Sequence, residues 1–371
     1  MPATLTPAQL TRDLAVRDLT DPAAGPHAVQ LVVDQAVETL AGLWPCDVRR
    51  SPGDRIVTVA DNYDNLGYDP ADVTRDARYT RYVDAGHVLR SHATALIPGA
   101  LRNLAANPAD DVLLVCPGLV YRRDSIDRLH SGTPHQLDLW RIVRGTVTRA
   151  DLEAMVAALV PDRRWRLEPR RHPYTVDGAQ LDVEQDGRWV EVAECGRAHP
   201  GVLARAGLGD GWSGLGLDRM VMLRKGIPDI RLLRSAEPAV AAQLTDLAPY
   251  RPVSALPPVR RDLSIAVPAE DRAEDLGDRV RDALGDEADV VESVQIRQET
   301  PYARLPAQAR ARLGATPDQK NLLVRLVLRP LDRTLSDHEA NVLRDRAYAA
   351  LHRGSVHQWA GLTGGRDSAG A

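Results

Sequence analysis

The stretch from Tyr121 to Trp140, YRRDSIDRLHSGTPHQLDLW, constrains the fold most strongly. It follows an apolar, strand-like run at 112–116 and a Pro117-Gly118 pair that predicts a turn. Its second half, around Gln136 and Asp138, predicts a returning strand. The result is a hairpin with a cationic mouth, and arginine side chains bind phosphate oxygens bidentately. On this stretch alone, a triphosphate site and a solvated charged hairpin remain equally good interpretations.

A second stretch, Gly211–Arg231, reads GWSGLGLDRMVMLRKGIPDIR. Gly214 and Gly216 predict a short strand, where the missing side chains let a ligand approach the backbone. An apolar helix is expected to follow and to end at Gly226. Arg219, at the junction of strand and helix, can stack on a base and contact phosphate.

These two stretches resemble motifs 2 and 3 of class II aminoacyl-tRNA synthetases. The spacing of YRRD, HSGTPHQLD and GLGLDRMVMLRKGIPDIR is similar to that in the catalytic subunit of phenylalanyl-tRNA synthetases, over residues 86–235. The resemblance implies an α+β fold with an antiparallel sheet flanked by helices. It also implies activation of an amino acid by ATP and Mg²⁺ as an aminoacyl-adenylate, followed by transfer to tRNA.

The resemblance assigns catalytic roles to two arginines, Arg122 and Arg219. Arg122 would bridge the α-phosphate and the substrate carboxylate, which places the attacking oxygen in line. Glu191 matches a glutamate of the family that helps to carry Mg²⁺ on ATP. The residues assigned to ATP are Arg122, Asp124, His130, Glu191, Gly214, Gly216 and Arg219.

The main-chain groups of the amino acid are assigned to two segments. His92 and Thr94, in the segment RSHAT, match a histidine and a serine that hold the ammonium and carboxylate groups. Gln136 and Asp138 share one strand face at a period of two, so both can reach the α-ammonium group. Asp138 stands where the family usually has glutamate.

The side-chain pocket departs from the family pattern. His172-Pro173-Tyr174-Thr175 stands where the family has F-P-F-T, Glu194 where it prefers glycine, and Trp212 where a gapless match places alanine. Each change fills the pocket or adds polar groups, so a smaller or polar side chain should fit better than a benzyl group. Strict alternation would put Glu194 on the opposite strand face from Glu191, unless the strand is interrupted near Cys195-Gly196.

The C-terminal part predicts a separate module. The segments PPVRRDLSIAV and RTLSDHEANVL resemble the fold-X anticodon-binding module of phenylalanyl-tRNA synthetases. The expected order is ferredoxin-like, β-α-β-β-α-β. Its elements are a strand from 257, a helix at 270–284, strands at 288–297 and 320–329, a helix at 336–351 and a short strand at 354–359.

Transfer RNA is a plausible partner of this module through its arginines and lysines. The acidic run 271–289 offsets their charge, and the net charge of the chain is −4, so an RNA contact would need local patches. Two alternatives therefore stay open. One is an amino-acid ligase that loads a small molecule or a carrier protein, and the other is a non-catalytic sensor of RNA or amino acid.

The predicted domains follow from these assignments. They are a loosely attached lead-in at 1–25, a catalytic domain at 26–250, an anticodon-binding-like domain at 257–360 and a flexible tail at 361–371. Within the catalytic domain we expect helices ending at Leu43, Ala106 and Val160, and strands at 164–168, 180–184 and 188–193. Residues 46–84 predict loops and short strands without an assigned role.

Composition predicts the setting of the protein. Three cysteines without a CxxC pair, and no apolar run of membrane-spanning length, predict a cytoplasmic protein without membrane contact. In a class II enzyme the helix that ends at Leu43 would be the motif 1 helix, which often builds a dimer interface, so the resemblance implies a monomer or a homodimer. Phenylalanine is absent, although nine tyrosines and six tryptophans are present. One hypothesis is that synthesis of the chain is independent of charged phenylalanyl-tRNA.

Overall fold

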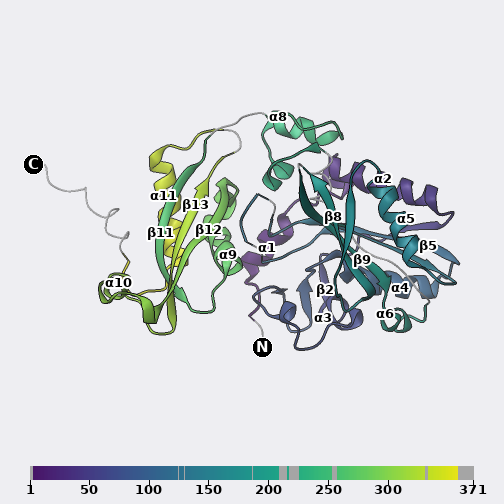
Figure 1. Cartoon of the computed structure of the whole chain (residues 1–371), viewed down its shortest axis with the longest axis horizontal. Helices are drawn as coiled ribbons and strands as arrows, with labels where there is room; N and C mark the ends of the chain where they lie inside the picture. The colour runs from purple at the N-terminus through teal and green to yellow at the C-terminus, as the bar shows by residue number, and fades with distance from the viewer. Residues whose placement is uncertain are drawn as a thin grey trace, which may run out of the picture. The chain divides into compact units, whose positions relative to one another are not determined.

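The computed structural model describes residues 3–123, 125–128, 130–185, 187–208, 225–252, 257–330 and 333–357, and the backbone of 215 and 216. The chain forms two compact units (Figure 1). The first unit comprises residues 1–122, 133–233 and 238–251, and the second comprises residues 123–132, 234–237 and 252–371. Among the described residues, no helix is both long enough and apolar enough to span a membrane.

The central sheet of the first unit is built on the predicted hairpin. Its order is β1-β5-β6-β10, with β5 antiparallel to β6, β6 antiparallel to β10, and β1 parallel to β5. The helix α4 packs its apolar side against β5 and β6 around the buried Trp140. The bounds are β1 Asp47–Arg50, α4 Ile97–Ala106, β5 Asp111–Leu119, β6 His135–Val143 and β10 Leu215–Gly216.

The predicted turn at Pro117-Gly118 is wrong, because β5 continues through both residues to Leu119. Gly118 lies opposite Gln136 with a φ of +153°, which favours glycine. A Cβ atom at Gly118 would overlap the guanidinium of Arg90. Arg90 is buried, and it donates hydrogen bonds of 2.7 Å each to the carbonyls of Leu119 and Pro52. Glycine therefore makes room for an arginine here and does not reverse the chain.

The N-terminal residues form part of the first unit. The helix α1, Pro7–Ala15, begins at a capping box on Thr6. Asp13, on this helix, is buried and forms a 2.6 Å ion pair with Arg81, which is also buried. The prediction of a loosely attached lead-in is therefore wrong for this helix.

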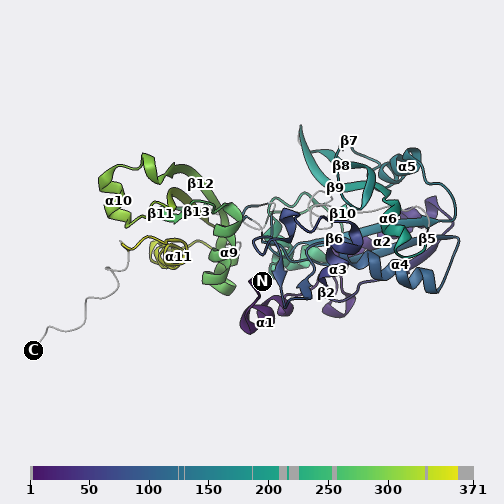
Figure 2. The same cartoon turned by 90° about the horizontal axis from the view of Figure 1, so that it is seen from below.

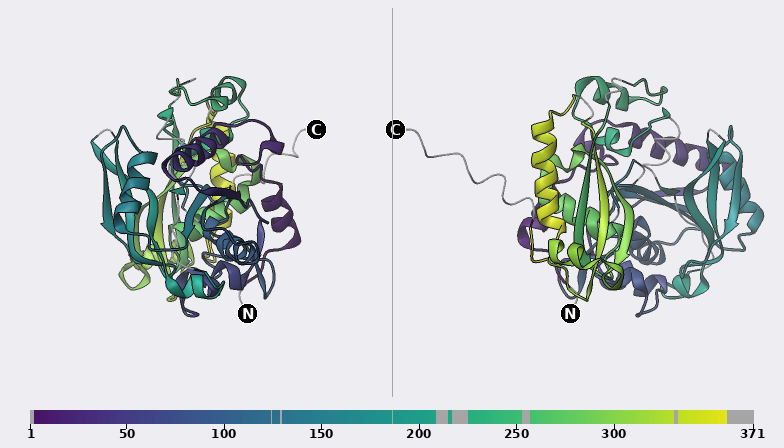
Figure 3. Two further views of the ribbon diagram at one scale, coloured as in Figure 1. Left: turned by 90° about the vertical axis from the view of Figure 1, so that its right-hand side faces the viewer. Right: turned by 60° about the vertical axis from the view of Figure 1, so that its left-hand side comes forward.

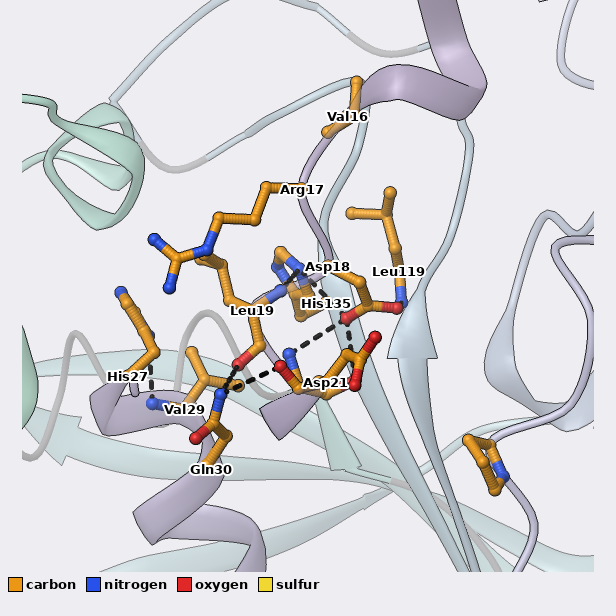
Figure 4. A network of polar contacts seen from close by, with 12 residues as sticks. Val16, Arg17, Asp18, Leu19, Asp21, His27, Val29, Gln30, Leu119 and His135 are labelled. Atoms are coloured by element: carbon orange, nitrogen blue, oxygen red, sulfur yellow. Dashed lines mark hydrogen bonds and ion pairs between the residues drawn. The ribbon is translucent and has the colours of Figure 1, made fainter. Parts of the chain in front are cut away.

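The segment after α1 is held by buried polar contacts with the central sheet (Figure 4). The Asp18 carboxylate accepts a 3.1 Å hydrogen bond from the Leu119 amide of β5. The Leu19 amide donates a 2.9 Å bond to Nε2 of His135 on β6. Gln30 of the helix α2, Ala28–Leu43, donates to the carbonyl of Leu19 at 3.2 Å. Residues far apart in the sequence supply these partners, which local patterns do not reveal.

A second antiparallel sheet, in the order β7-β8-β9, lies against the helix α5 (Figure 2). The helix α5 begins at a capping box, in which Thr148 accepts a hydrogen bond from the Asp151 amide. The bounds are α5 Arg149–Leu159, β7 Trp165–Pro169, β8 Thr175–Gln185 and β9 Arg188–Ala198. A small sheet in the order β2-β4-β3 and short helices complete the unit: β2 Ile56–Thr58, α3 Val59–Asn62, β3 Arg81–Tyr82, β4 His87–Leu89, α6 Pro200–Ala204 and α8 Pro238–Ala241.

The second unit contains an antiparallel sheet in the order β11-β13-β12, with α9 and α11 packed on one face (Figure 3). Five predicted elements are confirmed, and α10 was not predicted. The predicted last strand is absent at residues 354–357, and residues 358–359 lie outside the described part. The complete ferredoxin-like order thus stays a prediction. The bounds are β11 Val259–Pro268, α9 Ala273–Leu284, β12 Val291–Pro301, α10 Ala307–Leu313, β13 Gln319–Leu328 and α11 Asp337–Leu351.

Candidate amino-acid activation site

Strand β6 carries a buried carboxylate. Asp138 is 2% exposed, and its Oδ1 accepts a 3.0 Å hydrogen bond from the Trp140 indole. Burial raises the pKa of Asp138 to about 7, although Thr94 and Trp140 act in the opposite direction. An ammonium group bound beside Asp138 would restore its charge. Gln136, two residues earlier on the strand, accepts a 3.0 Å bond from the Ala93 amide.

His92 presents a hydrogen-bond acceptor beside these residues. Its Nε2 lies 3.0 Å from the Asn62 carbonyl, so Nε2 carries the proton and donates. Its Nδ1 is buried and has no hydrogen-bond partner among the described residues. Burial and the charge of Arg122 lower the pKa of His92 to about 3, so the ring stays neutral. A neutral Nδ1 can accept a hydrogen bond from an ammonium group.

Arg122 is anchored at the end of the hairpin strand. Its Nε donates a 3.0 Å hydrogen bond to the Ser91 carbonyl, and its own carbonyl accepts one of 3.3 Å from Arg81. Its positive charge lowers the pKa of both His92 and Glu194, which places the guanidinium near these two side chains. An anchored guanidinium is pre-organised to bind a carboxylate or phosphate bidentately.

A row of rings forms one wall of the site. Successive ring centroids from His92 to Tyr68, from Tyr68 to Tyr174, and from Tyr174 to His172 are 5.8, 6.2 and 5.4 Å apart. Burial raises the pKa of both tyrosines, so both phenols are neutral. Tyr68 lies in the segment to which the sequence assigned no role, and no local pattern distinguishes it from its neighbours.

Glu194 lies beside this wall. Its Oε2 is 3.1 Å from His172 Nε2, and its Oε1 is 3.9 Å from Arg170 Nε. Burial alone would raise the pKa of Glu194, but His172, Arg122 and Arg170 together lower it. The group is therefore an anion at neutral pH. The sequence also missed Arg170.

A register shift in β9 determines the direction of Glu194. Leu181 pairs with Ala193 while Asp182 pairs with Glu191, so Val192 is an extra residue in β9. Gln180 and Asp182 share a face, since their side chains are joined by a 2.7 Å hydrogen bond. Glu194 lies opposite Gln180 and Glu191 opposite Asp182, and both glutamates therefore belong to that face. The expected opposite orientation is wrong, although β9 continues past Cys195-Gly196.

The other predicted site residues are distributed as follows. Thr94 and Thr175 are buried, and the Thr175 hydroxyl lies 3.4 Å from His172 Nδ1. Glu191 is exposed on β9, and Gly216 pairs with Gln136 across β10 and β6. Asp124, Trp212, Gly214 and Arg219 lie outside the described residues, as do residues 220–223, where the apolar helix after Arg219 was expected.

The charged hairpin loop is paired within the second unit. Arg128 contacts Glu292 at 2.7 Å, and Arg123 contacts Asp278 at 3.4 Å. Ile126 joins the hydrophobic core, and its carbonyl accepts a 2.9 Å bond from Val294. The predicted phosphate ligand His130 is 2.7 Å from Asp127 in the same loop. Arg123 and Arg128 of the expected cationic mouth thus have carboxylate partners.

The basic residues expected to contact RNA are also largely paired. The second unit contains four such ion pairs: Arg261–Asp337 at 2.7 Å, Lys320–Glu299 at 3.2 Å, Arg325–Asp262 at 2.7 Å and Arg329–Glu292 at 2.7 Å. Pairing reduces the positive charge that these residues offer to a phosphate backbone.

Comparison with known proteins agrees with the resemblance. The family model of the tRNA synthetases class II core domain (F) matches residues 13–244. The chain therefore belongs to this family, and by that membership it is a synthetase-like ligase. The match begins within α1, in agreement with the folded N-terminal segment.

The curated relatives are of the phenylalanine type. The phenylalanine–tRNA ligase alpha subunit of Prochlorococcus marinus (strain MIT 9313) is 34% identical over 233 residues, which covers 59% of this chain and 68% of that relative. The corresponding subunit of Nostoc punctiforme is 28% identical over 235 residues, with 61% and 69% covered. That of Acinetobacter baumannii (strain AYE) is 35% identical over 191 residues, with 47% and 55% covered.

Proposed function

We propose that the protein activates an α-amino acid with ATP as an aminoacyl-adenylate and transfers the aminoacyl group to tRNA. The observation that carries this proposal is that, within a class II synthetase core, Arg122 lies close to His92, and both Arg122 and Asp138 lie close to Tyr174. An anchored cation, a neutral acceptor and a buried carboxylate complement the carboxylate and ammonium ends of an amino acid.

These residues orient the amino acid. Asp138 and His92 receive the α-ammonium group, and binding favours the ionised form of Asp138. Arg122 binds the α-carboxylate and the α-phosphate together, so that a carboxylate oxygen faces phosphorus in line. That oxygen forms the new bond to phosphorus, the bond to the β-phosphate oxygen breaks, and pyrophosphate leaves.

Mg²⁺ enters with ATP, and Glu191 would help to hold it. The exposed carboxylate of Glu191 suits an ion that keeps several waters and binds few protein ligands. The ion supplies neutralisation of the phosphate charge. In the transfer step, a hydroxyl of the tRNA terminal ribose attacks the aminoacyl carbonyl. The bond to AMP breaks, and the hydroxyl proton leaves with AMP or solvent. A cytosolic setting is part of the proposal.

A second candidate, a ligase with an acceptor other than tRNA, is favoured by the ion-paired arginines of the second unit. Aminoacylation assays with total tRNA, small amines and carrier proteins distinguish the acceptors. In either case we expect a substrate side chain other than benzyl, because His172, Tyr174 and Glu194 add polar groups to the proposed side-chain pocket.

Amino-acid-dependent ATP–pyrophosphate exchange tests the activation step. Arg122→Ala should lower exchange at least about 100-fold, since preorganised cations stabilise charge in the transition state. Arg149→Ala is a matched control, because Arg149 forms an exposed ion pair with Glu153 on α5. Unchanged exchange in Arg122→Ala, with the thermal transition retained, would refute the mechanism. No exchange with any amino acid would favour a non-catalytic sensor.

A further inference from the structure

A carboxylate stands among the rings of the side-chain pocket. The negative charge of Glu194 acts to raise the pKa of three side chains in the ring wall, His92, Tyr68 and Tyr174. The fourth, His172, lowers the pKa of Glu194. Its side chain is 36% exposed, so a ligand can reach the carboxylate. The anion has lone pairs for about four hydrogen bonds, more than its contacts with His172 and Arg170 occupy.

A purely apolar side chain would fit this pocket poorly. A hydrocarbon placed beside Glu194 would remove water from the anion without replacing its hydrogen bonds, which is unfavourable. A donor at that position would restore the lost bond. The wall formed by Tyr68, Tyr174 and His172 supports the same conclusion, since its rings carry hydroxyl and imidazole groups that make it more polar than a wall of plain benzene rings.

Glu194 is distinct from the residues that receive the α-ammonium group. Asp138 and Gln136 lie on β6 and His92 lies before α4, whereas Glu194 lies on β9 of the other sheet. The register shift at Val192 turns Glu194 to the face shared with Glu191. Glu194 therefore reaches the ring wall from a different element than the residues of β6 do.

We propose, on the basis of the proposed function, that the side chain of the activated amino acid carries a hydrogen-bond donor, which is a hydroxyl, amide or amino group. Glu194 accepts the hydrogen bond from this donor. Glu194 is then a specificity-determining residue, and His172 is a positioning residue that holds its carboxylate at 3.1 Å. The substrate class is a polar α-amino acid.

Matched pairs of amino acids test this inference on the full chain. We would measure kcat/KM in ATP–pyrophosphate exchange for tyrosine and phenylalanine, threonine and valine, asparagine and leucine, and lysine and norleucine. In the most active pair, the donor-bearing member should exceed its apolar counterpart by about 10- to 100-fold, as expected for a hydrogen bond to a charged group.

Glu194→Ala should reduce this ratio to about threefold or less, because the acceptor is lost. Glu184→Gln is the control, since Glu184 lies near the C-terminal end of β8 and pairs with the exposed Arg164. It should leave the ratio unchanged. An apolar member equal to or better than its donor-bearing counterpart would overturn the inference and leave the proposed function intact. A ratio that survives in Glu194→Ala would also overturn it.

A failure of the proposed function would give a different result in these assays, namely no exchange with any amino acid. If no amino acid supports exchange, titration calorimetry of the same pairs without ATP decides the inference. Tighter binding of donor-bearing amino acids, lost in Glu194→Ala, would support the pocket assignment for a binding protein. Equal binding within a pair, or no binding by any of them, would refute it.

Discussion

Replacing Asp138 by asparagine should abolish the pH dependence of amino-acid binding. Burial raises the pKa of Asp138 from 3.8 to about 7, and the bound α-ammonium group requires the ionised form. The ionised fraction is about one tenth at pH 6 and about nine tenths at pH 8, and apparent affinity scales with the competent fraction. Wild-type protein should therefore bind its amino acid about tenfold more weakly at pH 6 than at pH 8.

Titration calorimetry at several pH values measures this dependence, and proton release in buffers of different ionisation enthalpy identifies the group. Asp138→Asn should bind weakly at every pH. Asp111→Asn is the control, since Asp111 pairs with Arg141 at the far end of the hairpin. A wild-type affinity that changes less than about twofold between pH 6 and pH 8 would refute the reasoning, as would an unchanged pH dependence in Asp138→Asn.

The raised pKa of Asp138 also predicts how the free energy of unfolding changes with pH. Because the folded pKa lies above the unfolded value, the folded state binds more protons between these values, and its stability falls as pH rises from about 4 to about 7. The full effect of a shift of this size is on the order of 4 kcal/mol. In urea denaturation, the free energy of unfolding of wild-type protein relative to that of Asp138→Asn should fall as pH rises from about 4 to about 7. If the stability of wild-type protein relative to Asp138→Asn rose with pH instead, the raised pKa of Asp138 would be contradicted.

Two further predictions concern buried arginines. Arg81→Ala should destabilise the first unit by about 3–5 kcal/mol, because it leaves Asp13 buried without its 2.6 Å partner. A loss below about 1 kcal/mol in chemical denaturation would contradict this. Gly118→Ala should lose about 1–3 kcal/mol through overlap with Arg90. Gly145→Ala is the control, because Gly145 has a similar φ of +155° but nothing lies within 4 Å of the added carbon. Its loss of stability measures the cost of the backbone conformation without a steric overlap. Equal losses in both glycine variants would refute it.

Local patterns were sufficient for the elements that frame the site. The helix α5 begins at its capping box because Thr148 and Asp151 satisfy each other's backbone groups within one turn. The β5–β6 hairpin follows from two apolar runs separated by a charged loop, and Gln136 and Asp138 share a face because a strand repeats every two residues.

The same local reasoning failed where a distant residue decides the outcome. The Pro117-Gly118 pair has turn composition, but the strand continues because Arg90 fills the space beside Gly118. The N-terminal segment has a loop-like composition, but Asp13 and Asp18 find buried partners on other elements. These contacts depend on which chain segments meet, and composition carries no information about that.

The sequence by itself determined the family and the hairpin, because these depend on motifs a few residues long. Only the tertiary structure decided which side chains surround Glu194. The extra residue at Val192 reverses the alternation of β9 and turns Glu194 toward the rings. Folding brings Tyr68 to Tyr174 across more than one hundred residues of chain. Strand register and burial are set by non-local packing, and they determine which polar groups meet a substrate.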